Sequence, residues 1–188
     1  MSAASTIDRL LSNYRRQVRL PWPGNMSGKQ RIWFAVYPPA EERRTRARLA
    51  QFETLTLEAK HGWIAVDLTR LLPEFLAVHK YRESIFQRPQ HFKAGNELEV
   101  RAAALVKEAC TREEADAKSV VAVTGLASLF DFMRVSSLID RVEDSVPGRL
   151  LVFFPGEYAG NVYRFMDARD GFNYMAVPIT STESFLNP

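Results

Sequence analysis

Residues 32–37 read Ile-Trp-Phe-Ala-Val-Tyr, a run of six apolar side chains with no turn former among them. An uninterrupted β-rich run of this length is typical of a strand that is buried on both faces of a parallel sheet. Before it, apolar residues recur at helical spacing from Ile7 to Val18, and Ser5 and Asp8 have the spacing of a capping box at the start of that helix. The stretch 32–37 therefore predicts a central strand with a helix packed near it.

Further strands and helices alternate along the rest of the chain. Apolar, β-rich segments at 63–67, 120–124, 150–154 and 173–177 predict four more strands. The intervening segments have helical patterns: 39–59, which begins at Pro39; most of 68–118, with a loop around 87–96; and a face that runs from Phe132 to Val146. This alternation predicts an α/β fold, a three-layer sandwich with a mostly parallel sheet of about five strands and helices on both faces. We expect residues 1–188 to form a single domain.

The composition places the chain among ordinary globular proteins. Hydrophobic residues make up 46% and charged residues 25% of the sequence, and no segment approaches the roughly 18 apolar residues that span a bilayer. The first 20 residues lack the pattern of a signal peptide. Cys110 is the single cysteine, which suits a reducing compartment. We therefore expect a cytoplasmic protein.

Positive charge is concentrated near the start of the chain. Residues 1–48 hold ten Lys and Arg against three Asp and Glu, whereas the remainder is net acidic. A basic end of this kind is typical of contact with nucleic acid or an acidic partner. The candidate side chains for nucleic acid are Arg15, Arg16, Arg19, Arg43, Arg44, Arg46 and Arg48. The alternative is a solvated arginine-rich surface, and the lack of aromatic residues within 43–48 argues against strong binding. We expect any DNA binding to be weak and nonspecific.

In a parallel sheet, ligands bind beyond the carboxyl ends of the strands. The turn 124–128 places Gly125 between a strand and a helix, so Ser128 is expected either to cap that helix or to contact an anion, as in a degenerate nucleotide-binding domain. Asp67 is expected to be the N-cap of its following helix, and Arg134 to lie within the helix that follows the turn. The segment 24–30 does not qualify as a P-loop, because only three residues separate its glycines and it precedes a strand.

The remaining His, Cys and acidic residues form no recognisable catalytic or metal-binding pattern. His61, His79, His91 and Cys110 do not have the spacing of metal ligands, and Cys110 lies on a small-residue helical face that favours a buried thiol. Glu157 follows a strand but has no paired carboxylate or histidine. We therefore expect no enzymatic activity, no cofactor and no metal.

The connection from residue 155 to residue 174 is rich in aromatic side chains. Interface cores favour aromatic residues and arginine, so we expect part of a partner-binding surface here, formed by Glu157, Tyr158, Arg164 and Arg169. The alternative is that most of these rings fold back onto the sheet and its helices.

Three long stretches carry a family resemblance. They are 123–139 (VTGLASLFDFMRVSSLI), 151–158 (LVFFPGEY) and 163–174 (YRFMDARDGFNY). Together they resemble BrxB, the small subunit of BREX phage-defence systems, and the start of the chain and residues 32–37 fit the same family. The resemblance covers 1–70 and 119–180 but not 71–118. It implies a subunit needed for defence with no assigned catalytic residues, whose partners are other BREX components, with the phosphatase-like PglZ protein as the first candidate. It thus points to a scaffold or adaptor.

Overall fold

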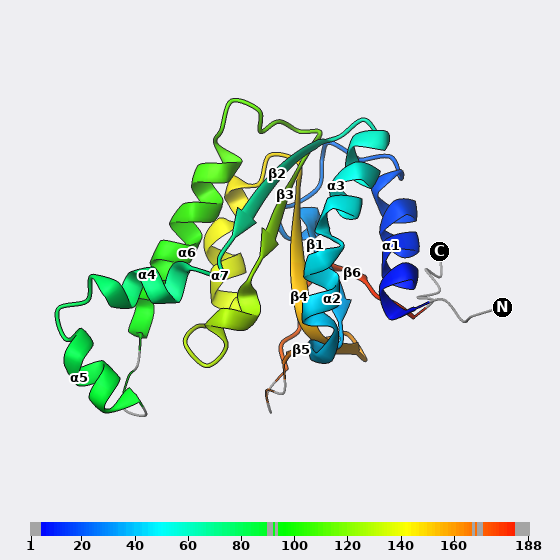
Figure 1. Ribbon diagram of the computed structural model, residues 1–188. Helices are drawn as coiled ribbons and strands as arrows, with labels where there is room; N and C mark the ends of the chain where they lie inside the picture. The colour runs from blue at the N-terminus through cyan, green and yellow to red at the C-terminus, as the bar shows by residue number, and fades with distance from the viewer. Residues whose placement is uncertain (1–4, 90–91, 93, 167, 169–170, 183–188) are drawn as a thin grey trace.

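Figure 1 shows the computed structural model, in which a sheet lies between two layers of helices. The structure describes residues 5–89, 92, 94–166, 168 and 171–182. Its strands are β1 (Ile32–Tyr37), β2 (Gly62–Asp67), β3 (Ser119–Thr124), β4 (Arg149–Ala159), β5 (Val162–Phe165) and β6 (Val177–Ile179). Its α-helices are α1 (Thr6–Val18), α2 (Glu42–Ala47), α3 (Leu49–Glu58), α4 (Leu71–Ala77), α5 (Arg82–Gln87), α6 (Gly95–Cys110) and α7 (Val135–Val142). The predicted α/β three-layer sandwich is confirmed.

The sheet has the order β2-β3-β4-β1-β6, and neighbours along this path are parallel. The central strand β1 pairs with β4 along its whole length, from Ile32 opposite Leu150 to Tyr37 opposite Pro155. All six residues of β1 are buried, as the opening run of apolar residues predicts. A further strand, β5, pairs antiparallel with the last residues of β4 and forms a hairpin with it.

Alternate residues of each strand enter two separate cores. On one face Trp33, Tyr37 and Phe153 pack with the apolar sides of α1 and α3. On the other face Phe34 and Phe154 pack with residues of α4, α6 and α7. Figure 1 shows these helix groups on opposite sides of the sheet. Because a parallel sheet needs both faces covered, the two cores explain why its strands are apolar throughout.

The first helix begins as the sequence predicts. The backbone N–H of Asp8 donates to Ser5 Oγ at 3.2 Å, and the backbone N–H of Ser5 donates to Asp8 Oδ2 at 3.2 Å. This reciprocal pair is a capping box with Asp in the place of the usual Glu. The helix then buries Tyr14, whose hydroxyl lies 2.5 Å from Thr56 Oγ1 of α3.

The predicted fifth strand at 173–177 is wrong in position. Residues 173–176 form no strand, and the strand β6 begins at Val177. The chain is held away from the sheet before this point, because Phe172 bridges to Tyr163 of β5 and the Tyr174 hydroxyl donates to Glu143. The strand β6 lies at the edge of the sheet, where Pro178 is tolerated.

Several predicted helices are divided. The segment 39–59 consists of a 3₁₀ turn at Pro39–Glu41 followed by α2 and α3, which are separated at Arg48. The face from Phe132 to Val146 is also broken, because Arg134 is extended, α7 spans only Val135–Val142 and a 3₁₀ turn follows at Glu143–Ser145. Arg134 is consequently the N-cap residue of α7 and does not lie within a helix. A helical spacing of apolar residues predicts the buried face correctly but does not reveal breaks within it.

Candidate functional site

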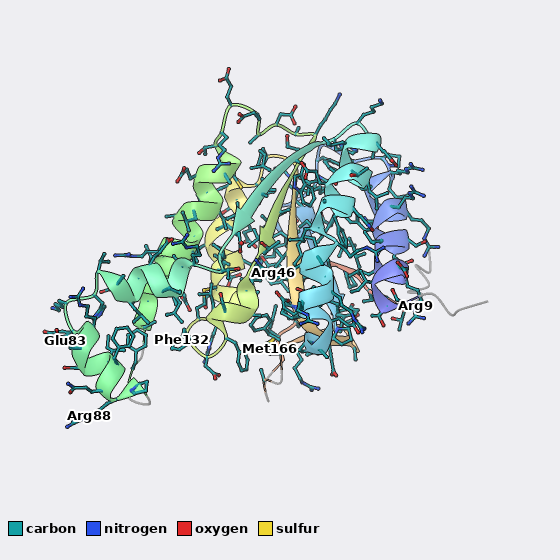
Figure 2. The ribbon with its side chains drawn as sticks, in the orientation of Figure 1. Arg9, Arg46, Glu83, Arg88, Phe132 and Met166 are labelled. Carbon is teal, nitrogen blue, oxygen red and sulfur yellow. The ribbon has the colours of Figure 1, made fainter. Side chains whose placement is uncertain are left out.

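The carboxyl ends of β2 and β3 meet a side chain of α2 in one polar cluster. Arg46 (labelled in Figure 2) donates from Nη1 to Thr69 Oγ1 at 2.6 Å and from Nη2 to Asp67 Oδ2 at 3.1 Å. Asp67 Oδ1 in turn accepts from the backbone N–H of Thr69 at 2.9 Å. Asp67 therefore closes the turn after β2 and is not the predicted N-cap of α4, which begins at Leu71 with Arg70 as its N-cap.

The turn after β3 packs directly against this cluster. Gly125 has a φ of 82°, which glycine adopts without steric cost, and a Cβ there would overlap the backbone nitrogen of Thr69 and lie 2.7 Å from Asp67 Oδ1. Gly125 is the N-cap of a 3₁₀ turn at Leu126–Leu129, and Ser128 donates from Oγ to the Gly125 carbonyl at 2.7 Å. Ser128 is thus not the N-cap. The space beside Gly125 is filled by a carboxylate, which repels phosphate.

The electrostatics of the cluster favour an ionised Asp67. Partial burial raises the pKa of this carboxyl, but the hydrogen bonds from Thr69 and the charge of Arg46 outweigh burial and leave the pKa below its usual value. The cluster links α2 to the turns after β2 and β3. Its polar atoms are engaged with one another, which favours a structural role.

The carboxyl ends of the central strands β1 and β4 are occupied by other parts of the chain. The hydroxyl of Tyr37 donates to Glu42 Oε2 at 2.6 Å, and burial with the nearby Glu42 charge raises the tyrosine pKa. On the neighbouring strand, the backbone N–H of Met166 donates to the carbonyl of Pro155 at 2.8 Å. The hairpin of β4 and β5 therefore continues past the edge at which open α/β sheets bind ligands.

This hairpin, residues 156–165, brings together three of the four predicted partner-binding residues. Glu157 pairs with Arg164 across the strands, and Arg164 Nη1 lies 3.6 Å from Glu157 Oε2. Both side chains are exposed, while Tyr158 is half-buried and donates from its hydroxyl to Asn161 Oδ1 at 2.9 Å. Arg169 lies outside the described residues. The hairpin thus presents an exposed ion pair on one side, while Tyr158 pairs with buried Tyr163 on the other side.

Most aromatic side chains of the connection turn inward. Tyr163 is fully buried and Phe165 nearly so, and Tyr163 donates from its hydroxyl to the Ala176 carbonyl at 2.8 Å. The half-buried residues that pack against the same core are Tyr158, Met166, Phe172 and Tyr174. The alternative in which these rings fold back onto the sheet therefore describes most of them.

Three of the four arginines at 43–48 have carboxylate partners. Arg44 pairs with Glu41 at 2.9 Å, Arg46 with Asp67 at 3.1 Å, and Arg48 with Asp8 at 2.9 Å. Arg43 is exposed. These pairs reduce the positive charge that the segment offers to a phosphate backbone.

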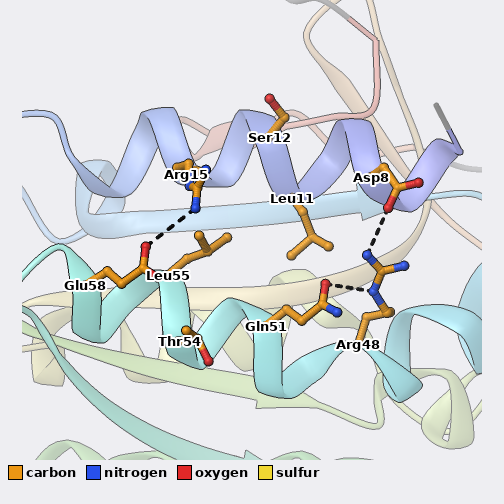
Figure 3. Close-up of a pocket in the computed structure, with 9 residues that line it drawn as sticks. All are labelled: Asp8, Leu11, Ser12, Arg15, Arg48, Gln51, Thr54, Leu55 and Glu58. Carbon is orange, nitrogen blue, oxygen red and sulfur yellow. Dashed lines mark hydrogen bonds and ion pairs between the residues drawn. The ribbon is translucent and has the colours of Figure 1, made fainter.

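A groove of about 410 Å³ lies between α1 and α3, next to these arginines (Figure 3). Its floor includes Leu11 and Leu55, and ion pairs close its two ends. Glu58 is shared by Arg15 at 3.5 Å and Arg19 at 3.4 Å, so one positive charge there is left without its own carboxylate. The groove is open and mixed in polarity, and most of its charged groups are paired.

The histidines and the cysteine that were considered as metal ligands do not cluster in the described part of the chain. Among the residues that the structure describes, no three His, Cys, Asp or Glu side chains gather as metal ligands. His61 stacks on Trp22 with ring centres 3.6 Å apart, and His91 lies outside the described residues. Cys110 is buried, as predicted, and burial raises its thiol pKa to about 11, which disfavours the reactive thiolate.

One buried cation lies at the opposite edge of the sheet. Arg149 is 4% exposed, and its guanidinium lies 4.6 Å from the ring centre of Trp22 and donates to the Gly148 carbonyl at 2.9 Å. Burial, together with the charge of Arg31, lowers its pKa. The indole face replaces a carboxylate as its partner, which is a structural use of a cation–π contact.

One region in which large apolar side chains are exposed was not identified from the sequence. Helices α4 and α5 with their connection, residues 71–87, form what we call the α4–α5 arm, and α5 projects away from the sheet in Figure 1. The arm exposes Val78, Tyr81 and Phe86. Their irregular spacing matches neither a helical nor a strand pattern, and that mismatch was the available signal.

No helix in the described part of the chain is long and apolar enough to span a bilayer. A family model described as BREX protein BrxB matches residues 64–179, more than half of the sequence. The chain belongs to the BrxB family. It is accordingly a subunit of a BREX phage-defence system, and the match includes residues 71–118, in which the sequence motifs showed no resemblance. Neither the curated proteins nor the solved structures contain a match to this BrxB-family chain.

Proposed function

We propose that this BrxB-family chain is a non-enzymatic adaptor of the BREX complex that acts through protein–protein contacts. Its family makes other BREX components the expected partners. One contrast carries the proposal. At the carboxyl edge of the sheet, the polar groups of Arg46, Asp67 and Thr69 bind one another, whereas the α4–α5 arm exposes large apolar side chains. Exposed apolar patches on a folded protein mark interaction sites.

The β4–β5 hairpin is the first docking surface of this proposal. Glu157 and Arg164 are exposed and extend past the sheet, and Tyr158 is the neighbouring residue, half-buried on the other side of the hairpin. An exposed charge pair suits a polar interface rim, where charge sets orientation and specificity. We assign PglZ to this surface, with Arg169 as a further contact.

Co-purification from cells that express the other BREX components tests the proposal. Arg164→Glu should reduce recovery of PglZ with the chain, because it places two carboxylates opposite each other and reverses the charge offered to the partner. The thermal melt should hardly move, since an exposed ion pair contributes at most about 1 kcal/mol. The matched control is Arg112→Glu, which reverses an exposed charge after α6.

The double variant Glu157→Arg/Arg164→Glu separates the two effects. It restores the ion pair within the hairpin but inverts its direction, so recovery of PglZ should stay low if the partner reads the charges. Full recovery of PglZ with both variants would remove the hairpin as its docking surface. If the unaltered chain recovers no BREX component, the adaptor function itself is wrong.

The non-enzymatic part of the proposal has its own test. ATP, GTP and NAD, each at roughly 1 mM, should not shift the thermal melt, because a ligand that binds the native state stabilises it. A reproducible upward shift of several degrees would contradict the proposal and favour a degenerate nucleotide-binding domain.

Nucleic-acid contact is the second candidate function, and the surplus arginine at Glu58 favours it. Binding that uses only clustered charge should fade by physiological salt and should not depend on sequence. Replacing Arg43, Arg44, Arg46 and Arg48 with Ala should weaken binding to all sequences equally. Tight, sequence-selective binding at that salt would make DNA contact the main function.

A further inference from the structure

The α4–α5 arm has an apolar surface that the chain itself leaves uncovered. Val78 is 72% exposed, Phe86 66% and Tyr81 59%, although side chains of this size are normally at least partly covered. Figure 2 shows Glu83 on α5 and Arg88 directly after this helix, both at the outer end of the arm and far from the sheet. The exposed apolar side chains therefore lie in the outer part of the arm, from Val78 to Phe86.

A groove runs along this surface. It has a volume of about 550 Å³ and is lined by Leu72, Pro73, Leu76, Ala77, Arg82 and Phe86. Leu71 and Phe75 of α4 are buried in the core, while Leu72 and Leu76 are half-buried, because they pack against the same core and also line the groove. The chain itself therefore covers the apolar residues of α4 only in part.

Positive charge lies at the groove and in the connection next to it. Arg82 lines the groove and donates from Nη1 to the Ala77 carbonyl at 3.2 Å, and in the connection before it Lys80 lies over the ring of Tyr81 at 4.7 Å. Within the described part of the chain, neither residue forms an ion pair, nor does Arg88. Of the two nearby carboxylates, Glu74 is already paired with Arg70 at 3.3 Å, which leaves Glu83. The uncovered surface thus combines apolar side chains with unneutralised positive charge.

We propose that the groove of the α4–α5 arm binds a short amphipathic helix of another BREX component, which has apolar side chains on one side and acidic side chains next to them. This inference rests on the proposed adaptor function and adds a second docking surface to it. Apolar anchors at helical spacing fit a groove of this kind, and acidic neighbours complement Lys80, Arg82 and Arg88. A second copy of the chain fits less well, because a twofold contact would bring the same cations of both copies together.

Site-specific photo-crosslinking in the BREX complex tests this inference. A photoreactive phenylalanine analogue replaces Phe86 in the full chain, which is co-expressed with the other BREX components, and the crosslinked peptide is identified by mass spectrometry. We expect a segment of another component with apolar residues at helical spacing and adjacent Asp or Glu. The same analogue at Leu57, which is 52% exposed on α3, is the control and should not capture that segment.

Charge and apolar variants measure the contribution of the surface. Lys80→Glu/Arg82→Glu should reduce recovery of the crosslinked component about tenfold or more, because it places like charges opposite the acidic side chains of the partner segment. The control Lys107→Glu/Arg112→Glu makes the same charge change in the last turn of α6 and just after that helix, outside the α4–α5 arm. It should leave recovery unchanged. Phe86→Ser should also reduce recovery, and Leu57→Ser should not. Thermal melts confirm that each variant is folded.

The outcomes discriminate between the two proposals. Capture of a second copy of the chain, capture of a basic segment, or full recovery with the folded arm variants would overturn this inference and leave the adaptor function standing. If the unaltered chain associates with no BREX component, both proposals fall together.

Discussion

The β4–β5 hairpin and the α4–α5 arm have similar side chains, but the hairpin buries most of its aromatic rings whereas the arm exposes them. Both extend beyond the sheet and both carry aromatic and basic residues. In the hairpin Tyr163 is fully buried, whereas in the arm Tyr81 is 59% and Phe86 66% exposed. The hairpin continues β4, so alternate side chains turn toward the core, while α5 is a helix of six residues without a covering element. Backbone context, more than aromatic content, therefore decides which region is free to bind.

The strongest test of this comparison is removal of a hairpin ring. Tyr163→Ala removes a buried ring that packs against Phe34 and Phe154 and should lower the free energy of unfolding by about 3–5 kcal/mol. Urea denaturation followed by circular dichroism measures the loss. A loss below about 1 kcal/mol would mean that the hairpin does not belong to the core.

A smaller loss is expected from the hairpin backbone. A Cβ at Gly156 would overlap the carbonyl oxygen of Arg164 on the facing strand. Gly156→Ala should therefore cost about 1–3 kcal/mol of unfolding free energy, the usual range for overpacking. Gly160 is a poor site for the control because its φ is 56°, whereas Gly24 has no atom near its Cβ position, and Gly24→Ala should be nearly neutral.

Alkaline pH should weaken the fold, and Tyr163 and Tyr174 contribute to this on the hairpin side, as Tyr14 and Tyr37 do on the other face of the sheet. Burial raises the pKa of Tyr163 and of Tyr174, so the unfolded chain loses these protons first as pH rises. The stabilisation is complete below the unfolded tyrosine pKa of about 10 and is lost as pH rises above it. Tyr163→Phe should cost about 1 kcal/mol at neutral pH, through the lost bond to Ala176, and should flatten the decline above pH 10. An unchanged slope in denaturation at pH 9 to 11 would show that Tyr163 does not contribute.

The smallest effect on stability is expected in the arm. Phe86→Ala removes a ring that is mostly exposed and should change the free energy of unfolding by less than about 0.5 kcal/mol. The same urea measurement applies. A loss as large as that of Tyr163→Ala would show that the arm is covered in solution and would erase the difference between the two regions.

Local sequence rules predicted the elements whose surroundings are local or uniformly apolar. The strand 32–37 is buried on both sides, and the capping box of Ser5 and Asp8 depends only on neighbouring residues. The strand β5 was missed because its pairing depends on β4, and the 173–177 segment was misplaced because Phe172 and Tyr174 are held by distant residues.

The site was less predictable than the fold for a related reason. Asp67 and the 124–128 turn were candidates because each follows a strand, but Asp67 is bound by Arg46 from α2, a contact that no spacing rule reveals. The partner-binding residues at the hairpin were placed together, and three of them lie side by side, yet their function stays a prediction. The exposed apolar surface of the α4–α5 arm was missed because exposure depends on whether another part of the fold packs against a residue, which local sequence does not show.

The position of β1 between β4 and β6 also has a consequence for biosynthesis. Ile32 pairs with Leu150 and Trp33 with Val177, so the central strand is synthesised more than a hundred residues before either neighbour. Until β4 has left the ribosome, the apolar side chains and backbone groups of β1 lack their main partner strand. Folding through such distant pairings is slow and exposes aggregation-prone segments. The nascent chain is therefore expected to need chaperone protection until its last third has been made.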